Sequence, residues 1–140
     1  HKHISTLPLD YRHTEATQRT LVAATVNGLF ERTICWTHDE QSTDASDLFA
    51  AVTRSTFYQL LGSAVADPAD PERLQKRRQA FATKFPLLDY HTIVLGFQRT
   101  PGGPSRWLSH EEISNGTYRA LSAPGQHHVI GIVRPWTARP

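Results

Sequence analysis

Two histidines and one arginine in the second half of the chain, His91, His128 and Arg119, are residue types that can cleave a phosphodiester. Transesterification of RNA needs a base near the 2′-oxygen, an acid near the leaving oxygen and a cation on the phosphate. These three side chains supply that set if they share one face of a sheet. In the alternative interpretation His91 merely ends a strand, and the neighbours His127 and His128 point to opposite faces of theirs.

A second group of residues is suited to binding a partner rather than to chemistry. Basic residues are densest around Arg73–Arg78, where Lys76 is also found, and a tryptophan follows closely after an arginine at two places near the carboxyl terminus. Arginine and tryptophan are enriched at interfaces, and both stack on single-stranded bases. In the alternative interpretation the charges form the solvated face of a helix and the tryptophans belong to the core. The candidate binding residues are Arg73, Arg77, Arg78, Arg106, Trp107, Arg119, Arg134 and Trp136.

The amino-terminal residues His1-Lys2-His3 offer one metal chemistry. A free amino terminus, two backbone nitrogens and the His3 imidazole form a square-planar set that suits Cu(II) or Ni(II), provided that residue 1 is the native terminus. No other histidine pair has the spacing of metal ligands, and no cofactor is expected. Cys35 is the single cysteine, so we expect no disulfide within the chain and a small buried thiol at this position.

Composition narrows the class of protein. The chain has 140 residues, of which 39% are hydrophobic and 20% charged, which suits a single domain over residues 1–140 with a polar lead-in over residues 1–19. No stretch approaches the roughly 18 apolar residues of a membrane span, so no membrane association is expected. A net charge of +2 is too small for a protein that packages nucleic acid, and eight histidines make that charge sensitive to pH.

The elements that must position these residues begin with a predicted β-hairpin. Asn27-Gly28 lies between two β-prone runs, residues 20–26 and 29–36, and both central residues of a type I′ turn need positive φ. A helix over residues 16–33 is the alternative, against which Asn-Gly in mid-helix argues. Apolar spacing then predicts the main helix over residues 46–65.

A shorter helix and an antiparallel sheet are expected to follow. Asp70 before Pro71 predicts a helix over residues 71–83. The remaining predictions are a strand over residues 90–99, a turn at 101–104, one helical turn that begins at the capping box of Ser109 and closes at Asn115-Gly116, and a hairpin of residues 117–122 and 127–133. The expected fold class is therefore α+β, with an N-terminal β-hairpin, one main helix plus a shorter one, and an antiparallel sheet.

Three stretches carry a resemblance to a known family. They are Cys35 followed by Ser46–Val52, the predicted strand Tyr90–Leu95, and residues 118–132, where Arg119 stands on the first strand of the predicted closing hairpin. Together with the element order, these stretches resemble the fungal guanyl-specific ribonuclease fold and the ribonuclease-like secreted effectors of plant-pathogenic fungi. The resemblance implies a microbial ribonuclease-like fold and a secreted protein, which acts outside the producing cell or inside a host cell.

The chain departs from that family in its catalytic residues and its disulfides. The family uses a glutamate base on the central strand and a histidine acid on the last strand. Here the central strand offers His91 and no glutamate, and the last strand ends at Val133-Arg134-Pro135; Arg119 alone falls in a plausible place. The family is also usually closed by disulfides, which one cysteine cannot form.

These departures favour a protein that binds rather than cleaves. The expected function is that of a non-catalytic ribonuclease-like effector, a monomeric virulence protein that binds a host protein or RNA to suppress plant immunity. One alternative is an active secreted ribonuclease or ribotoxin, an endoribonuclease that uses His91 and Arg119, with His128 as a further candidate. The other alternative is a small intracellular α+β interaction module.

Overall fold

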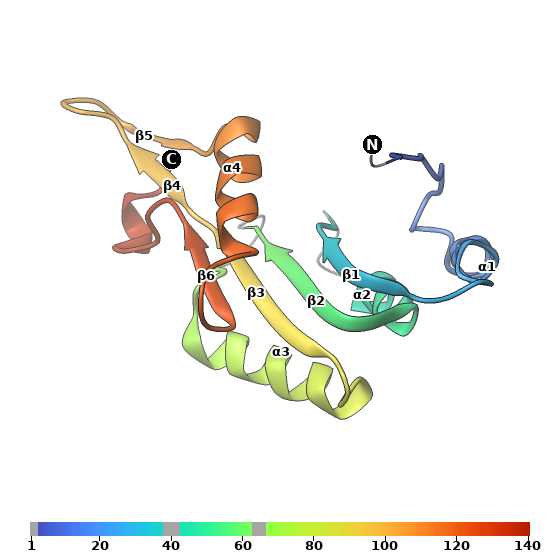
Figure 1. The fold of residues 1–140 in the computed structure, drawn as a ribbon. Coiled ribbons are helices and arrows are strands. Elements are labelled where there is room, and N and C mark those ends of the chain that lie inside the picture. Colours follow the sequence, from blue (N-terminus) through green and yellow to red (C-terminus); the bar gives the residue numbers. More distant parts are fainter. Residues whose placement is uncertain (1–2, 38–42, 63–66) are drawn as a thin grey trace.

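A four-stranded parallel sheet forms the centre of the molecule in a computed structural model that describes residues 3–37, 43–62 and 67–140 (Figure 1). The strand order is β1-β2-β3-β6, and a separate antiparallel pair is formed by β4 and β5. The fold is therefore α/β, and the expected α+β fold with an antiparallel sheet is wrong. The strands are β1 (Phe30–Cys35), β2 (Thr53–Leu61), β3 (Asp89–Leu95), β4 (Phe97–Arg99), β5 (Ser105–Trp107) and β6 (His127–Ile130).

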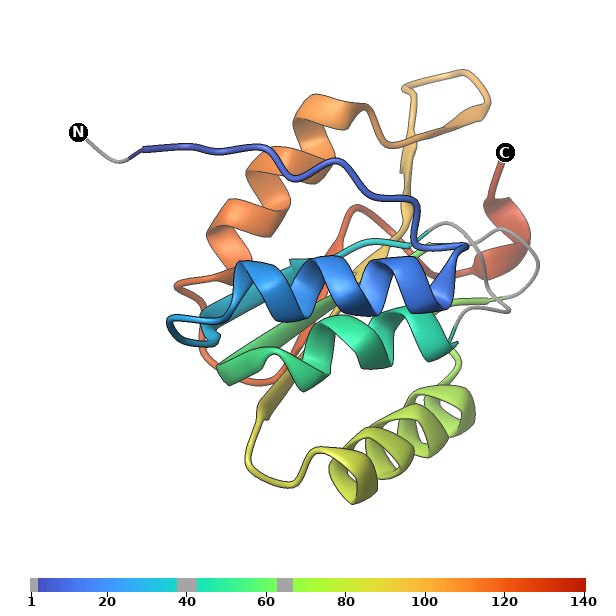
Figure 2. The ribbon, with the colours of Figure 1, turned by 90° about the vertical axis from the view of Figure 1, so that its right-hand side faces the viewer.

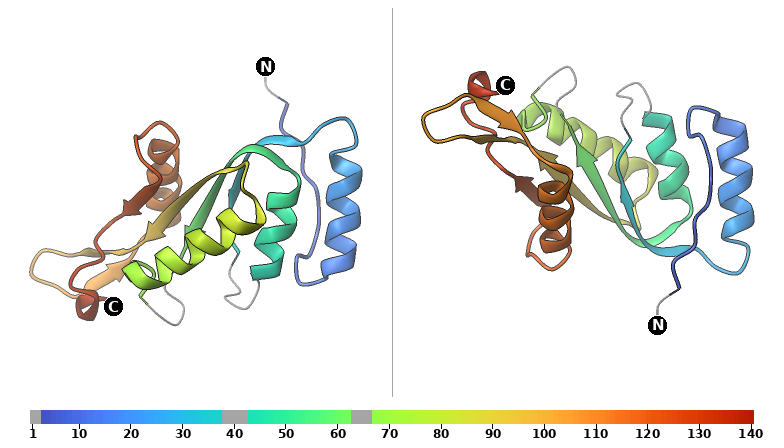
Figure 3. Two further views of the ribbon diagram at one scale, coloured as in Figure 1. Left: turned by 90° about the horizontal axis from the view of Figure 1, so that it is seen from below. Right: turned by 90° about the horizontal axis from the view of Figure 1, so that it is seen from above.

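Helices cover both faces of the sheet. The helices are α1 (Thr14–Ala24), α2 (Thr43–Ala51), α3 (Pro71–Lys84) and α4 (His110–Ala120), followed by the 3₁₀ turn η1 (Trp136–Ala138). Helices α2 and α3 cover one face, with α1 alongside α2, whereas α4 covers the other (Figure 2). The strand order advances in one direction while the helices change face, so the connection through α4 has the opposite hand to those through α2 and α3 (Figure 3).

The predicted N-terminal hairpin is wrong in its first arm. Residues 14–24 form α1, anchored by the buried side chains of Thr17 and Leu21, which lie four residues apart on one face. The helix alternative for residues 16–33 is thus correct for its first half. The predicted type I′ turn is wrong as well: Gly28 has φ +147°, but Asn27 does not have positive φ, and the segment joins a helix to β1 rather than two strands.

The predicted main helix over residues 46–65 is wrong beyond Ala51, where α2 ends and β2 begins two residues later. Apolar residues of β2 such as Phe57 and Leu60 fit the spacing of a helix, but the β-branched and aromatic residues around them favour a strand. Strand β2 pairs on both sides, with β1 and β3. The last predicted residues of this helix, 63–65, lie outside the described residues.

The shorter helix is confirmed as α3. The carboxylate of Asp70 accepts a hydrogen bond from the Glu72 amide at 3.0 Å, and Pro71 occupies the first turn. This signal is local, because the cap residue and the helix start are adjacent in the chain. This helix could therefore be predicted without knowledge of the tertiary fold.

The capping box at Ser109 is also confirmed, but the helix that it begins continues through Asn115-Gly116 to Ala120. A Cβ atom on Gly116 would lie 2.6 Å from Cδ1 of Ile130, so glycine allows α4 to pack directly on β6. The predicted strand over residues 117–122 and the closing hairpin are therefore wrong. Strand β6 pairs parallel with β3 instead.

Two apolar layers hold the sheet between the helices. The α4 side packs around Tyr58, Ile93 and Ile130, and the α2–α3 side packs around Phe57 and Phe81. The predicted burial of Cys35 in the second layer is confirmed, and burial raises the pKa of its thiol to about 11. Among the described helices, none is long and apolar enough to cross a membrane.

Candidate functional site

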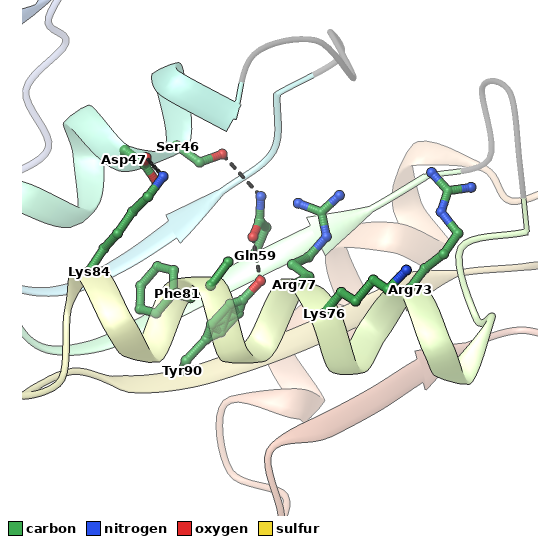
Figure 4. A pocket seen from close by; sticks show the side chains of 10 residues that line it. Ser46, Asp47, Gln59, Arg73, Lys76, Arg77, Phe81, Lys84 and Tyr90 are labelled. Carbon is green, nitrogen blue, oxygen red and sulfur yellow. Dashed lines mark hydrogen bonds and ion pairs between the residues drawn. The ribbon is translucent and has the colours of Figure 1, made fainter.

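A pocket of about 330 Å³ lies between α2 and α3 on one face of the sheet, and we call it the α2–α3 pocket (Figure 4). Helix α3 supplies the basic wall and α2 supplies the facing wall. The floor comes from β2 and β3. The side chains that line the pocket include Ser46, Asp47, Gln59, Arg73, Lys76, Arg77, Phe81, Lys84 and Tyr90.

The basic wall follows from the spacing of residues along α3. Arg73, Arg77 and Lys84 are separated by four and seven residues, which places them on one side of the helix, with Lys76 beside them. The helix is anchored by Phe81, whose ring lies 5.3 Å from that of Phe57 in β2. Burial of Phe81 therefore holds the neighbouring cations at the mouth of the pocket.

The floor is polar, buried and uncharged. The Tyr90 hydroxyl donates a hydrogen bond to Oε1 of Gln59, whose amide nitrogen donates to the Ser46 hydroxyl at 3.0 Å. All three residues are buried. Burial raises the pKa of Tyr90 to about 12, although the nearby Arg77 acts in the other direction, so the phenol stays neutral at physiological pH.

Positive charge in the pocket exceeds negative charge. Four basic side chains from α3 face one carboxylate, that of Asp47, which holds Lys84 at 2.6 Å. Lys76 pairs with the exposed Glu72 at 3.4 Å, a contact that adds little because water screens both groups. The side chain of Arg73 has no ion pair or hydrogen bond with any other residue that the structure describes. The pocket is therefore suited to a ligand that carries several negative charges.

Other predicted binding residues have structural partners. Arg78 donates to the carbonyl oxygens of Tyr90 and Gln126 at 3.0 and 3.1 Å, so it ties α3 to the sheet instead of facing the pocket. Arg106 forms a two-point ion pair with Glu112. Arg134 is paired with Asp67 at 2.7 Å.

The two predicted tryptophans come together near the carboxyl terminus. The rings of Trp107 and Trp136 lie 6.3 Å apart, and Arg139 lies over the Trp136 ring at 5.4 Å. Trp136 also contacts the fully buried Phe97, at 6.0 Å between ring centroids. This cluster anchors η1 against β4 and β5, and it does not extend to the α2–α3 pocket.

The residues that form the floor of the α2–α3 pocket were not predicted from the sequence. Gln59 and Tyr90 come together because β2 pairs with β3 in a register that aligns Phe57 with Tyr90. No local signal contains that register. Lys84 could have been found, because it lies seven residues after Arg77 on the same side of a correctly predicted helix.

The histidines singled out in the sequence meet on the opposite face of the sheet. Nδ1 of His91 lies 3.2 Å from Nε2 of His128, and Nε2 of His91 lies 2.8 Å from the Asp89 carboxylate. Arg119 and His128 line a second cavity, between α4 and β6. His127 points away and contacts the Thr92 hydroxyl at 2.9 Å, which confirms that the two neighbouring histidines face opposite ways. Asp89 was not predicted.

The proposed Cu(II) or Ni(II) site lies largely outside the described residues, since it needs His1; His3 is exposed. Within the described part of the chain, no group of three or more His, Cys, Asp or Glu side chains is placed to hold a metal ion. Comparison with models of protein families, with curated protein sequences and with solved structures finds no match to this chain. The α2–α3 pocket is therefore interpreted from its own geometry and charge.

Proposed function

We propose that the protein binds the sugar–phosphate backbone of a single-stranded nucleic acid in the α2–α3 pocket. The observation that supports this proposal is the row of basic side chains on α3, which faces a neutral polar floor and a single carboxylate. Phosphate contacts by arginine and lysine supply most of the affinity of sequence-independent nucleic-acid binding.

The length of the row favours a chain of phosphates over a single one. Arg73 and Lys84 are eleven residues apart on α3, which corresponds to about 16 Å along the helix axis. A lone phosphate could contact one end of this row, whereas successive phosphates of a strand could follow it. The rings of Phe81, on α3, and Tyr90, on the floor, are buried, so little of either face is exposed for a base to stack on. We therefore expect weak dependence on base sequence.

The wider roles expected from the sequence stay predictions. The effector role was inferred through a ribonuclease-like fold, and a parallel sheet does not have that architecture. Binding of RNA by a secreted protein remains compatible with the α2–α3 pocket, as does an intracellular interaction module. Cleavage of RNA would depend on His91 and Arg119, with His128 as a further candidate, and these residues lie on the other face.

Competition between ligands tests the proposal directly. A fluorescent single strand of about 12 nucleotides, as RNA and as DNA, is titrated with the protein and followed by anisotropy. We expect binding that weakens steeply with salt, and displacement by long-chain polyphosphate at far lower concentration than by inorganic phosphate. The proposal is wrong if neither strand binds at low salt, or if inorganic phosphate competes as well as the chain does.

A further inference from the structure

A second cavity, of about 430 Å³, lies between α4 and β6, and we call it the α4 cavity. Its polar lining includes Asn115, Arg119, His128 and Glu112. Glu112 is already engaged: two hydrogen bonds from Arg106, at 2.8 and 2.9 Å, and the Ser109 amide lower its pKa to about 2. The cavity is also distinct from the α2–α3 pocket, which lies on the other face of the sheet.

Arg119 gives the α4 cavity a permanent positive charge. Its side chain is exposed on α4, and it has no ion pair or hydrogen bond with any other residue in the described part of the chain. The one carboxylate among the lining residues is Glu112, which is neutralised by Arg106. The charge of Arg119 is therefore available to a ligand in the cavity.

A chain of hydrogen bonds joins the two histidines to Asp89. The Asp89 carboxylate can only accept, so Nε2 of His91 carries a hydrogen and donates it at 2.8 Å. Nδ1 of His91 lies 3.2 Å from Nε2 of His128, and one of these two nitrogens donates to the other. His128 is the member of this chain of groups that lines the α4 cavity.

We propose that the α4 cavity is a binding site for a small oxyanion, in which Arg119 supplies a permanent charge and the Asp89–His91–His128 chain adds a second charge on acidification. Asp89 and His91 are positioning residues here. They hold the His128 ring at the cavity through the contact between His91 and His128, and the Asp89 carboxylate partly balances the new charge through His91.

The groups around His91 and His128 set the pH range in which His128 gains a proton. His91 stacks on Tyr58 of β2 at 4.4 Å, and Arg32 of β1 lies over that ring at 5.9 Å. Burial, followed by the electrostatic effect of His91 and His127, lowers the pKa of His128, against a hydrogen bond with the Gly125 backbone that acts to raise it. Besides Asp89 itself, the charged groups that face the chain are Arg78 of α3, and Arg119 and Glu112 of α4.

Binding and protonation must therefore be linked. His128 is neutral above its lowered pKa and gains a charge below it. An oxyanion in the cavity stabilises the protonated ring and raises that pKa. If it does so by about one unit, affinity at the acid limit exceeds that at the neutral limit by about tenfold.

Sulfate is the probe for this site, because its charge is constant over the range in which histidine titrates. Sulfate is added to ¹⁵N-labelled protein at about pH 5.5 and about pH 7.5, and the backbone amides of Asn115 and Gly131 report on the α4 cavity. The amides of Ser46 and Gln59 report on the α2–α3 pocket in the same spectra. We expect affinity at the α4 cavity to be several-fold higher at the lower pH, below the limit of about tenfold because His128 is only partly protonated at about pH 5.5.

Variants identify the groups involved. Arg119→Gln should abolish sulfate binding in the α4 cavity at both pH values, and His128→Gln should leave weak binding that no longer depends on pH. His110→Gln, an exposed histidine at the start of the same helix, is the matched control and should change neither. Equal affinity of the unaltered protein at the two pH values would overturn the proposal, as would sulfate shifts confined to the α2–α3 pocket. If His128→Gln fails to fold, the exposed Arg119→Gln variant still decides whether the cavity binds.

Discussion

Replacing both Arg73 and Arg77 by glutamine removes two positive charges from the α2–α3 pocket and keeps long polar side chains in their place. On a single strand, each phosphate that a cation neutralises contributes about 0.7 to the slope of log K against the logarithm of salt concentration. Loss of two such contacts lowers the slope by about 1.4. Relative to a 1 M reference, binding at about 0.1 M salt should therefore weaken by about 25-fold, or about 2 kcal/mol.

The assay is anisotropy of the labelled strand over a series of salt concentrations, which gives affinity and slope together. The matched control is Arg19→Gln with Arg99→Gln, two exposed arginines outside the pocket that lower the net charge by the same amount. We expect the control to weaken binding by less than about threefold at the same salt concentration. Equal weakening by the two double variants would refute the reasoning, because net charge alone would then account for the affinity.

A single replacement tests whether binding weakens because a charge is lost or because the floor of the α2–α3 pocket has changed. Arg77 faces the Tyr90 hydroxyl, whereas Arg73 contacts no floor residue in the described structure. Arg73→Gln alone should therefore weaken strand binding by about fivefold, the effect of one lost phosphate contact at about 0.1 M salt. Its urea unfolding midpoint should equal that of the unaltered protein.

The other predictions concern packing and ionisation. Gly116→Ala would place a methyl group 2.6 Å from Cδ1 of Ile130, so we expect a loss of about 1–3 kcal/mol in the free energy of unfolding, measured by urea denaturation. The pKa of Glu112 is lowered to about 2 by its hydrogen bonds with Arg106, so this contact stabilises the fold above the ordinary carboxylate pKa of 4.5 and is lost as pH falls towards 2. Urea unfolding between these limits should accordingly show a shallower acid dependence in Glu112→Gln; an unchanged dependence would contradict this assignment. The thiol of Cys35, with its pKa raised to about 11 by burial, should resist a thiol reagent at about pH 8 in the native protein and react at once in urea.

The sequence predicted those parts of the fold whose signals are complete within a few residues. The Asp70 cap of α3 and the Ser109 capping box of α4 both join a side chain to a backbone amide two or three residues away. In contrast, β2 was predicted as helix because its apolar spacing fits both structures. Residues 53–61 form a strand because they pair with both β1 and β3, and these partners lie far away in the chain.

The same distinction explains what could be predicted of the α2–α3 pocket and the α4 cavity. Arg73 and Arg77 were singled out because basic residues are densest on this stretch of a correctly predicted helix, and their four-residue spacing places them on one side of it. The contact between His91 and His128 depends on parallel pairing of β3 with β6, in a register that aligns Ile93 with His128. An antiparallel hairpin, as expected, would have placed His128 beside different neighbours. The sequence therefore singled out both histidines, but it did not predict the strand pairing that brings them together.

Strand β3 links the two proposed sites, because its successive residues face opposite sides. Tyr90 closes the floor of the α2–α3 pocket, and the next residue, His91, supports His128 at the α4 cavity. Arg78 binds the carbonyl of Tyr90 and that of Gln126, just before β6, so one guanidinium holds α3 against both strands of the histidine pair. This explains why neighbouring arginines in one basic cluster have different roles. Arg77 faces the α2–α3 pocket, whereas Arg78 holds β3 and the start of β6 in place through backbone carbonyls.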